Sequence, residues 1–290
     1  MSIPAAYIGV VIIWATTPLA IKWSSEGAGH LFGVASRMVL GLVVCLLLVA
    51  LLGRRMRWHG QAVKTYLAAG LGLWGAMTSV YWGAQFIPSG LISVVFGFTP
   101  VVTGVMAAVW LGEKVFTPFK IIGMLLGVGG IGMIFVQGLA LGQGAAMGLV
   151  AVILSVHIHG LSSVWVKRLA EDLPALETTT GALLVATPLF LATWLWADAS
   201  LPASVSAKAV GSIIYLGVVG SVVGFILYYY ILHRVEVNKV SLITLMTPIL
   251  ALFLGQWINH ESISSTEWLG VVVILIGLSC FQWGDGRRYR

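Results

Sequence analysis

Charge is the scarcest property of this sequence. Only 9% of the 290 residues are charged, whereas 59% are hydrophobic, and the mean hydropathy is +1.00. Soluble domains carry about 25% charged residues, so this composition excludes a protein with a fully water-facing surface. Repeated apolar runs of about 20 residues, the length that crosses a bilayer core, predict membrane-spanning helices. Barrel strands would instead alternate apolar and polar residues.

Cysteines and catalytic motifs are also scarce. Cys45 and Cys280 lie inside apolar runs, so we expect two small buried hydrophobic residues rather than a disulfide. The sequence has no glycine-rich phosphate loop ending in Lys-Ser or Lys-Thr, and therefore no indication of an ATP-driven motor within this chain. No clustered catalytic constellation is visible. The chain is therefore predicted not to be an enzyme and to hold no cofactor.

Carboxylates are absent from the middle of every predicted span. This argues against obligatory proton antiport through a buried acid and favours export driven by the substrate gradient. His157 and His159 are two residues apart, so they point to different faces of a helix and cannot share a metal ion. No metal site is predicted. For His159, a hydrogen-bonded interior side chain and a role in proton transfer both stay open.

The apolar runs predict ten spans joined by short linkers rich in Gly, Pro and Ser. The spans are roughly 4–22, 32–52, 65–86, 89–111, 118–137, 145–167, 174–196, 209–231, 239–258 and 267–283. With a cytoplasmic N-terminus, 13 Lys and Arg residues fall in cytoplasmic loops and 2 in outside loops. This bias predicts that both termini are cytoplasmic. It also explains the net charge of +6 by membrane anchoring rather than by nucleic-acid binding.

The stretch 93–113 is repeated once in the chain, at a constant offset of 148 residues. The matching pairs are Ser93 and Ser241, Thr99-Pro100 and Thr247-Pro248, Glu113 and Glu261, and Tyr81 and Tyr229. Each half then holds five spans, an odd number, so the second half enters the membrane in the opposite direction. We predict an all-α membrane protein of two inverted five-helix repeats, residues 1–140 and 141–290. Its site is expected near the membrane midplane between the halves.

Two glycine pairs lie at equivalent places in the two halves. Gly123 and Gly130 in the fifth span correspond to Gly270 and Gly277 in the tenth, each pair seven residues apart on one helix face. Small residues allow helix backbones to approach closely in a membrane. The pattern therefore predicts tight packing along these faces.

These features together resemble the drug/metabolite transporter superfamily. The matching features are W-A-T-T-P-L-A-I-K near the start, Arg37 in the second span, and T-P followed by L-G-E closing the fourth. Within the EamA-type, ten-span members, the chain is most similar to the YddG-type exporters of aromatic and other amino acids. The resemblance implies a monomer with one central cavity that opens alternately to the two sides of the membrane. It also implies that the fifth and tenth spans are peripheral.

Polar and aromatic residues at helical spacing define the predicted binding site, because polar side chains in lipid turn toward the bundle interior. The predicted substrate-binding residues are Trp14, Thr17, Trp74, Thr78, Tyr81, Ser93, Gly97, His159, Trp165, Tyr229, Ser241 and Thr244. Aromatic walls suit an apolar or aromatic substrate, and hydroxyl groups suit a carboxylate. Taken singly, each aromatic residue also fits ordinary helix packing or an interface anchor. Pro100 and Pro248 are candidate hinges, with simple packing kinks as the alternative.

Three charged residues have two interpretations each. Arg37 either attracts the carboxylate of a substrate or extends its side chain toward the lipid headgroups. Glu113 and Glu261 lie at the ends of spans, where they are expected to cap a helix or pair locally rather than bind substrate.

The sequence therefore predicts a multi-pass secondary transporter of the cell inner membrane. Its expected cargo is amino acids, aromatic and other apolar or neutral ones, or related metabolites, which it exports by alternating access. The alternatives are a drug or other metabolite carrier of the same fold, and a channel or lipid scramblase. The expected partners are a small-molecule substrate and the lipid bilayer, without nucleic acid, and the protein is expected to act as a monomer.

Overall fold

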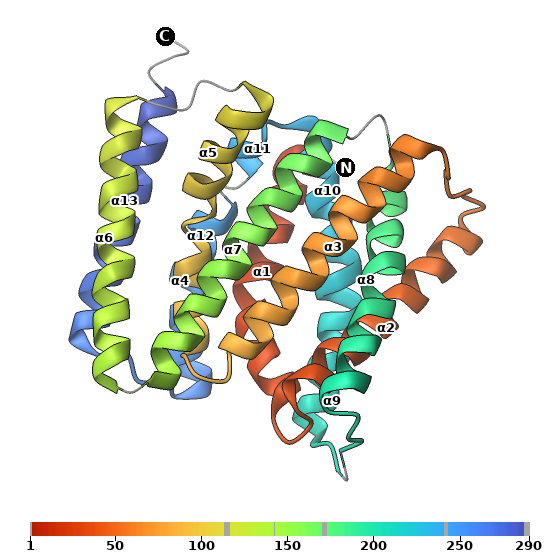
Figure 1. Ribbon diagram of the computed structural model, residues 1–290, viewed down its shortest axis with the longest axis horizontal. Helices are drawn as coiled ribbons and strands as arrows, with labels where there is room; N and C mark the ends of the chain where they lie inside the picture. The colour runs from red at the N-terminus through yellow and green to blue at the C-terminus, as the bar shows by residue number, and fades with distance from the viewer. Residues whose placement is uncertain are drawn as a thin grey trace.

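The computed structural model describes residues 2–112, 117–141, 143–169, 173–202, 204–240 and 243–286. The regular structure of these residues is helical throughout (Figure 1). The helices are α1 (Ile3–Ser25), α2 (His30–Leu51), α3 (Gly60–Gly83), α4 (Ser89–Phe96), α5 (Thr99–Leu111), α6 (Pro118–Leu141), α7 (Gln143–Leu169), α8 (Ala175–Ala197), α9 (Ala207–Tyr215), the π-helix η1 (Leu216–Val223), α10 (Gly224–Arg234), α11 (Val237–Val240), α12 (Ile243–Asn259) and α13 (Ser265–Gly286). The predicted all-helical class is confirmed for the described residues.

Seven helical segments are long and apolar enough to cross a bilayer. They are Ile3–Ser25, His30–Leu51, Ser89–Leu111, Pro118–Gln137, Gly144–Leu169, Ala175–Ala197 and Ala207–Arg234. The other three predicted spans fall on α3, which is less apolar, on α12, which has 17 residues, and on α13, whose apolar part is Ser265–Phe281. The structure therefore supports an integral membrane protein, and the count of ten crossings stays a prediction.

Helices α6 and α13 pack side by side at one edge of the molecule (Figure 1). Their glycines make this contact close: a Cβ atom added to Gly130 would lie 2.7 Å from the carbonyl oxygen of Gly270. Gly123 and Gly277 meet in the same way further along the pair. The predicted tight packing along the glycine faces is confirmed, and the pair leaves the centre of the bundle to the other helices.

The centre of the bundle contains a helix that is broken in two. α4 ends at Phe96 and α5 begins at Thr99, with Pro100 in the first turn of the new helix. Proline fits there because its missing N–H has no partner in a first turn anyway. The hydroxyl of Thr99 donates to the carbonyl oxygen of Phe96 at 2.5 Å, which satisfies an acceptor at the break. Pro248, in contrast, lies inside the continuous helix α12. One static conformation does not test motion at either proline, and the hinge role of both stays a prediction.

The long segment from α9 to α10 changes its winding in the middle. Leu216–Val223 forms a π-helix, η1, between two α-helical parts. A π-turn carries an extra residue, which widens the helix and turns local side chains away from their α-helical directions; such turns are frequent at functional sites. η1 packs against α2, and this contact brings it to the central pocket described next.

Candidate binding site in the centre of the bundle

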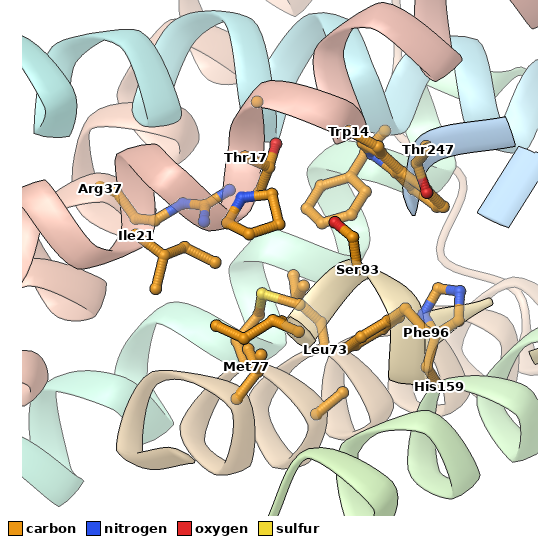
Figure 2. Close-up of a pocket in the computed structure, with 16 residues that line it drawn as sticks. Trp14, Thr17, Ile21, Arg37, Leu73, Met77, Ser93, Phe96, His159 and Thr247 are labelled. Atoms are coloured by element: carbon orange, nitrogen blue, oxygen red, sulfur yellow. The ribbon is translucent and has the colours of Figure 1, made fainter. Parts of the chain in front are cut away.

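A narrow pocket lies between helices from both halves of the sequence (Figure 2). Its lining residues are Trp14, Thr17, Pro18, Ile21, Arg37, Leu73, Ala76, Met77, Val80, Ile92, Ser93, Phe96, His159, Gly220, Phe225 and Thr247. The space open to the centre of a water-sized sphere is about 80 Å³, and the total empty space between the lining atoms is about 710 Å³. The smaller value is the one to compare with known cavities, and it lies below the about 300–1,000 Å³ typical of small-molecule sites, so the pocket is narrow in this conformation.

Aromatic rings form one end of this pocket. The ring of Trp14 lies 5.8 Å from that of His159 and 5.0 Å from that of Tyr228, measured between centroids. Phe96 lies 6.3 Å from His159 and completes the group (Figure 2). Tyr228 is held from behind, because its hydroxyl is 2.6 Å from the hydroxyl of Ser163. The result is a rigid apolar wall of the kind that contacts a flat or branched apolar group.

Arg37 lies at the opposite end (Figure 2). Its side chain is 1% exposed, which excludes the alternative in which it extends to the lipid headgroups. Its Nε donates to the Ser221 hydroxyl at 3.1 Å, and its Nη1 donates to the Tyr81 hydroxyl at 3.4 Å. Both partners are neutral. Among the described residues, no carboxylate forms an ion pair with this guanidinium.

The π-helix η1 shapes the space around Arg37. It presents Ser221 as a hydrogen-bond acceptor and Gly220 as a lining residue without a side chain. A Cβ atom added to Gly220 would lie 3.2 Å from Nη2 of Arg37, closer than most real contacts of a Cβ. Sequence reasoning did not identify this element, because a π-turn has no sequence signal comparable to that of a cap or a proline.

The structure brings together part of the predicted site. The pocket lining contains Trp14, Thr17, Ser93 and His159. Tyr81 and Tyr229 are buried directly behind the lining, Tyr81 on Arg37 and Tyr229 on the ring of Phe225, which itself lines the pocket. The lining residues Phe96, Met77 and Gly220 were not among the predicted residues.

Four other predicted residues lie elsewhere. Trp74 donates through Nε1 to the hydroxyl of Thr193 on α8 at 3.0 Å. Thr78 faces a separate open groove, and Trp165 is 37% exposed beside Trp110. Gly97 follows α4 at the helix break.

Three candidates are not covered by the described side chains. Ser241 and Glu113 lie outside the described residues, as does the side chain of Thr244, whose backbone is in α12. Their predicted roles stay predictions.

A polar cluster lies at the last turn of α1, and we call it the Lys22–Glu261 cluster. Nζ of Lys22 lies 3.4 Å from Oε1 of Glu261 and donates to the carbonyl oxygen of Ile87 at 3.2 Å. Oε2 of Glu261 accepts from the Ser89 hydroxyl at 2.9 Å, and Oε1 accepts from Nδ2 of Asn259 at 2.9 Å. The expectation that Glu261 pairs locally is confirmed, and its partners tie α1, α4 and α12 together.

The same partners determine the ionisation of Glu261, which lies in the loop between α12 and α13. Burial acts to raise the pKa of its carboxyl group. A backbone hydrogen bond at Ser89, the charge of Lys22 and side-chain hydrogen bonds from Asn259 and Ser89 outweigh burial and hold the pKa below its ordinary value of 4.5. The carboxylate is therefore ionised, and the cluster is a closed ion pair.

A bundle of apolar helices around a narrow polar-and-aromatic pocket, lined from both halves of the chain, defines a membrane transporter. A family model supports this class: the EamA-like transporter family matches residues 2–136 and again residues 146–281. The chain belongs to the EamA-like transporter family, and the predicted membership of the drug/metabolite transporter superfamily is confirmed. Its members are transporters rather than enzymes. The narrower YddG-type specificity stays a prediction.

Individual relatives are similar over nearly the whole chain. The uncharacterized transporter YoaV of Bacillus subtilis is 26% identical, and the match covers 97% of each chain. The probable terminal-alkyne amino-acid exporter of Streptantibioticus cattleyicolor is 26% identical over 88% of this chain and 85% of its own. The uncharacterized inner membrane transporter YedA of Escherichia coli is 23% identical over 94% of this chain and 88% of its own. A solved crystal structure shares the fold with a TM-score of 0.71 at 17% identity, over 98% of both chains.

Proposed function

We propose that this protein is a secondary transporter that exports amino acids with apolar, aromatic or other neutral side chains, or related metabolites, across the cell inner membrane. The substrate would occupy the central pocket, which opens alternately to the two sides. The observation that carries the proposal is this pocket itself, with Trp14 and Ser93 lining it from the first half and His159 and Thr247 from the second. A site between two halves is where a rocking motion exchanges access.

The proposed architecture is ten spans in two inverted halves, residues 1–140 and 141–290. Two equivalent lysines support it, because each ends its helix by donating to carbonyl oxygens 65 residues further on: Lys22 to Ile87 and Lys167 to Leu232. Lys167 also donates to Val235, the residue that matches Ile87 at the 148-residue offset. In Figure 1, α1 begins and α13 ends toward the same end of the bundle, which supports placement of both termini on one side of the membrane.

The conformation bears on the mechanism. The Lys22–Glu261 cluster joins α1, α4 and α12 at the end of α1, which is the outer side in the proposed topology. We infer that this cluster closes the pocket to the outside in this conformation, so that export requires the cluster to open. A carrier differs from a channel in that its central site is never open to both sides of the membrane at once.

The substrate class draws on two supports. The aromatic end of the pocket suits an apolar side chain, while Ser93 and Arg37 offer hydrogen-bond donors to a carboxylate. One relative is named as a probable terminal-alkyne amino-acid exporter, which supports an amino acid as the substrate class. A drug carrier of the same fold would instead take ligands without a carboxylate.

Counterflow in proteoliposomes tests the proposal. Vesicles that contain the protein and are preloaded with phenylalanine, threonine or methionine should accumulate the same radiolabelled amino acid in a saturable, trans-stimulated way. Flux without saturation or trans-stimulation would favour the channel or scramblase, and absence of flux for every amino acid would reject the substrate class.

A blocking variant locates the path. Ser93→Phe places a bulky ring in the pocket and should abolish counterflow, because Ser93 is 2% exposed and lines the narrow space. Ser279→Phe is the matched control, since Ser279 is exposed on α13 at the edge of the molecule. Equal activity of both variants would place the substrate path outside this pocket.

A further inference from the structure

The starting observation is a buried cation for which the described fold provides no anion. Arg37 is 1% exposed, and its polar interactions with described residues are those with the hydroxyls of Ser221 and Tyr81 and, at 5.9 Å, with the ring of Tyr81. A buried charge is costly unless an opposite charge compensates it, and arginine does not lose its proton in proteins. Buried ion pairs elsewhere in membrane proteins meet this requirement with an acidic side chain.

The guanidinium group is held in a fixed direction. Ser221 accepts from Nε on one edge and Tyr81 accepts from Nη1, while Nη2 makes no hydrogen bond with any described residue. Nη2 lies instead beside Gly220, where the missing side chain keeps the approach open. This arrangement leaves a donor of a positively charged fork directed toward the pocket, which is the geometry that binds a carboxylate oxygen.

The charges around the pocket are unequal. Arg37 carries a positive charge at the pocket lining, and no aspartate or glutamate occurs among the described residues that line the pocket. The opposite end is formed by Trp14, Phe96 and His159 (Figure 2). A ligand that fits has an anionic group at one end and an apolar body at the other. The ammonium group of an amino acid finds no carboxylate here.

We propose that Arg37 binds the carboxylate of the transported molecule, so that the substrates are amphipathic monocarboxylates for which an amino group is dispensable. This inference rests on the proposed transport function and narrows it. Amino acids with apolar side chains belong to the class, and so do the corresponding acids without nitrogen. Ser221 and Tyr81 act as positioning residues, because they orient the guanidinium and do not line the pocket themselves.

Four related compounds separate the charge requirements. 3-Phenylpropionate carries only the carboxylate, phenylalanine carries both charges, phenylalaninamide carries only the ammonium, and 3-phenylpropionamide is neutral. Each is tested for thermal stabilisation of the purified protein and for competition with phenylalanine counterflow in proteoliposomes, because a ligand stabilises the state that it binds. We expect both acids to bind and to compete. Both amides should be weaker by about tenfold or more, since the amide oxygen still accepts from the guanidinium but lacks the negative charge that strengthens this bond.

The variant Arg37→Gln tests the residue. It should remove the preference for the acids over the amides, while Arg234→Gln, an exposed arginine at the end of α10, should preserve it. Size-exclusion chromatography checks that the variants are folded. If Arg37→Gln does not fold, the four compounds on the wild-type protein still decide the question.

The outcomes are distinct. Equal competition by acids and amides, or strongest binding of phenylalaninamide, would overturn the inference and leave the transport function intact. Unchanged acid preference in a folded Arg37→Gln protein would also overturn it. Absence of binding and counterflow for all four compounds would reject the proposed substrate class, and the inference would fall with it.

Discussion

Lys22 and Arg37 are two cations in neighbouring helices that differ in what surrounds them. Lys22 ends α1 in a cluster that supplies the Glu261 carboxylate, and the same carboxylate is satisfied by Ser89 and Asn259. Arg37 is more deeply buried, and its hydrogen bonds to described residues go to the neutral hydroxyl groups of Ser221 and Tyr81. The described fold therefore supplies a negatively charged partner for Lys22 but none for Arg37.

This difference assigns Lys22 a role in the stability of the fold and Arg37 a role in substrate binding. An ion pair that is complete within the fold holds helices together, and removal of one partner leaves the other without compensation. A buried charge without a partner contributes little to holding the fold but raises the affinity for whatever supplies the missing charge. The comparison predicts that substitutions at the two positions have opposite consequences.

Lys22→Met should have the largest effect on stability. It leaves the Glu261 carboxylate with its hydrogen bonds but without its cation, at a cost of about 2–3 kcal/mol, below the usual range for a fully buried pair because Lys22 is partly exposed. A lowered melting temperature in detergent, followed by tryptophan fluorescence, would measure it.

The control is the exposed pair of Lys208 and Glu26, whose side chains are 47% and 46% exposed. Lys208→Met should leave the melting temperature nearly unchanged, because exposed ion pairs contribute little. If Lys22→Met and Lys208→Met melt at the same temperature, the Lys22–Glu261 cluster is not a stabilising element and the comparison fails.

Arg37→Met should have the opposite effect to Lys22→Met: little change in stability and a large loss of transport. It removes a buried charge and keeps much of the side-chain volume, so the melting temperature without ligand should stay close to that of the wild type. Counterflow of carboxylate substrates should fall about tenfold to a hundredfold, because the charged hydrogen bonds to the substrate are lost. A large drop in melting temperature with transport intact would show instead that Arg37 is a structural residue.

Much of the fold follows from the sequence because its causes are local and repeated. Apolar runs of membrane length locate the helices, and Gly130 faces Gly270 as the seven-residue glycine spacing predicts. The count of crossings is harder to predict, since glycines and residues such as Tyr66, Thr78 and Ser79 lower the hydropathy of α3, and α12 is short. Length and hydropathy alone then no longer distinguish a spanning helix from a buried one.

The site can be predicted from the sequence only in part. Helical periodicity shows which residues share one face of a helix, but not which other helix that face packs against. Trp14 and Ser93 lie on the lining, whereas Trp74 belongs to an equally polar stripe that turns toward Thr193 of α8. The sequence also left the position of Arg37 open between pocket and headgroups. Its guanidinium is hydrogen-bonded to Ser221 in the π-turn, and no local sequence pattern indicates this contact.

A pH titration should sharpen the comparison through Glu261. Its pKa is lowered in the folded protein, so the ionised carboxylate contributes stability above about pH 4.5 that is lost as the pH falls through the folded pKa. The melting temperature of the wild type should fall over that range and approach that of Glu261→Gln. If the difference between the two proteins is the same at pH 3.5 and pH 7, the ionised carboxylate is not what stabilises the cluster.

Gly220→Ala should have the smallest effect and the most specific one. The added methyl group would lie 3.2 Å from Nη2 of Arg37, so the guanidinium must shift by a few tenths of an ångström at the place where the carboxylate is proposed to bind. We expect the apparent affinity for carboxylates to weaken by about twofold to tenfold, within the range of a distorted charged hydrogen bond. Competition of 3-phenylpropionate with phenylalanine counterflow measures this change.

Gly211→Ala is the matched control for Gly220→Ala, because it lies in α9 of the same continuous segment and an added methyl group meets nothing within 4 Å. In both variants alanine replaces glycine within a helix, a change that favours the helix by about 0.5–1 kcal/mol. Gly211→Ala should therefore melt at or above the wild-type temperature, whereas the close contact with Nη2 of Arg37 offsets part of this gain in Gly220→Ala. Only Gly220→Ala should change the response to carboxylates. If the two variants transport alike, Nη2 of Arg37 does not face the substrate, and the uncompensated charge belongs to the contact between α2 and η1 instead.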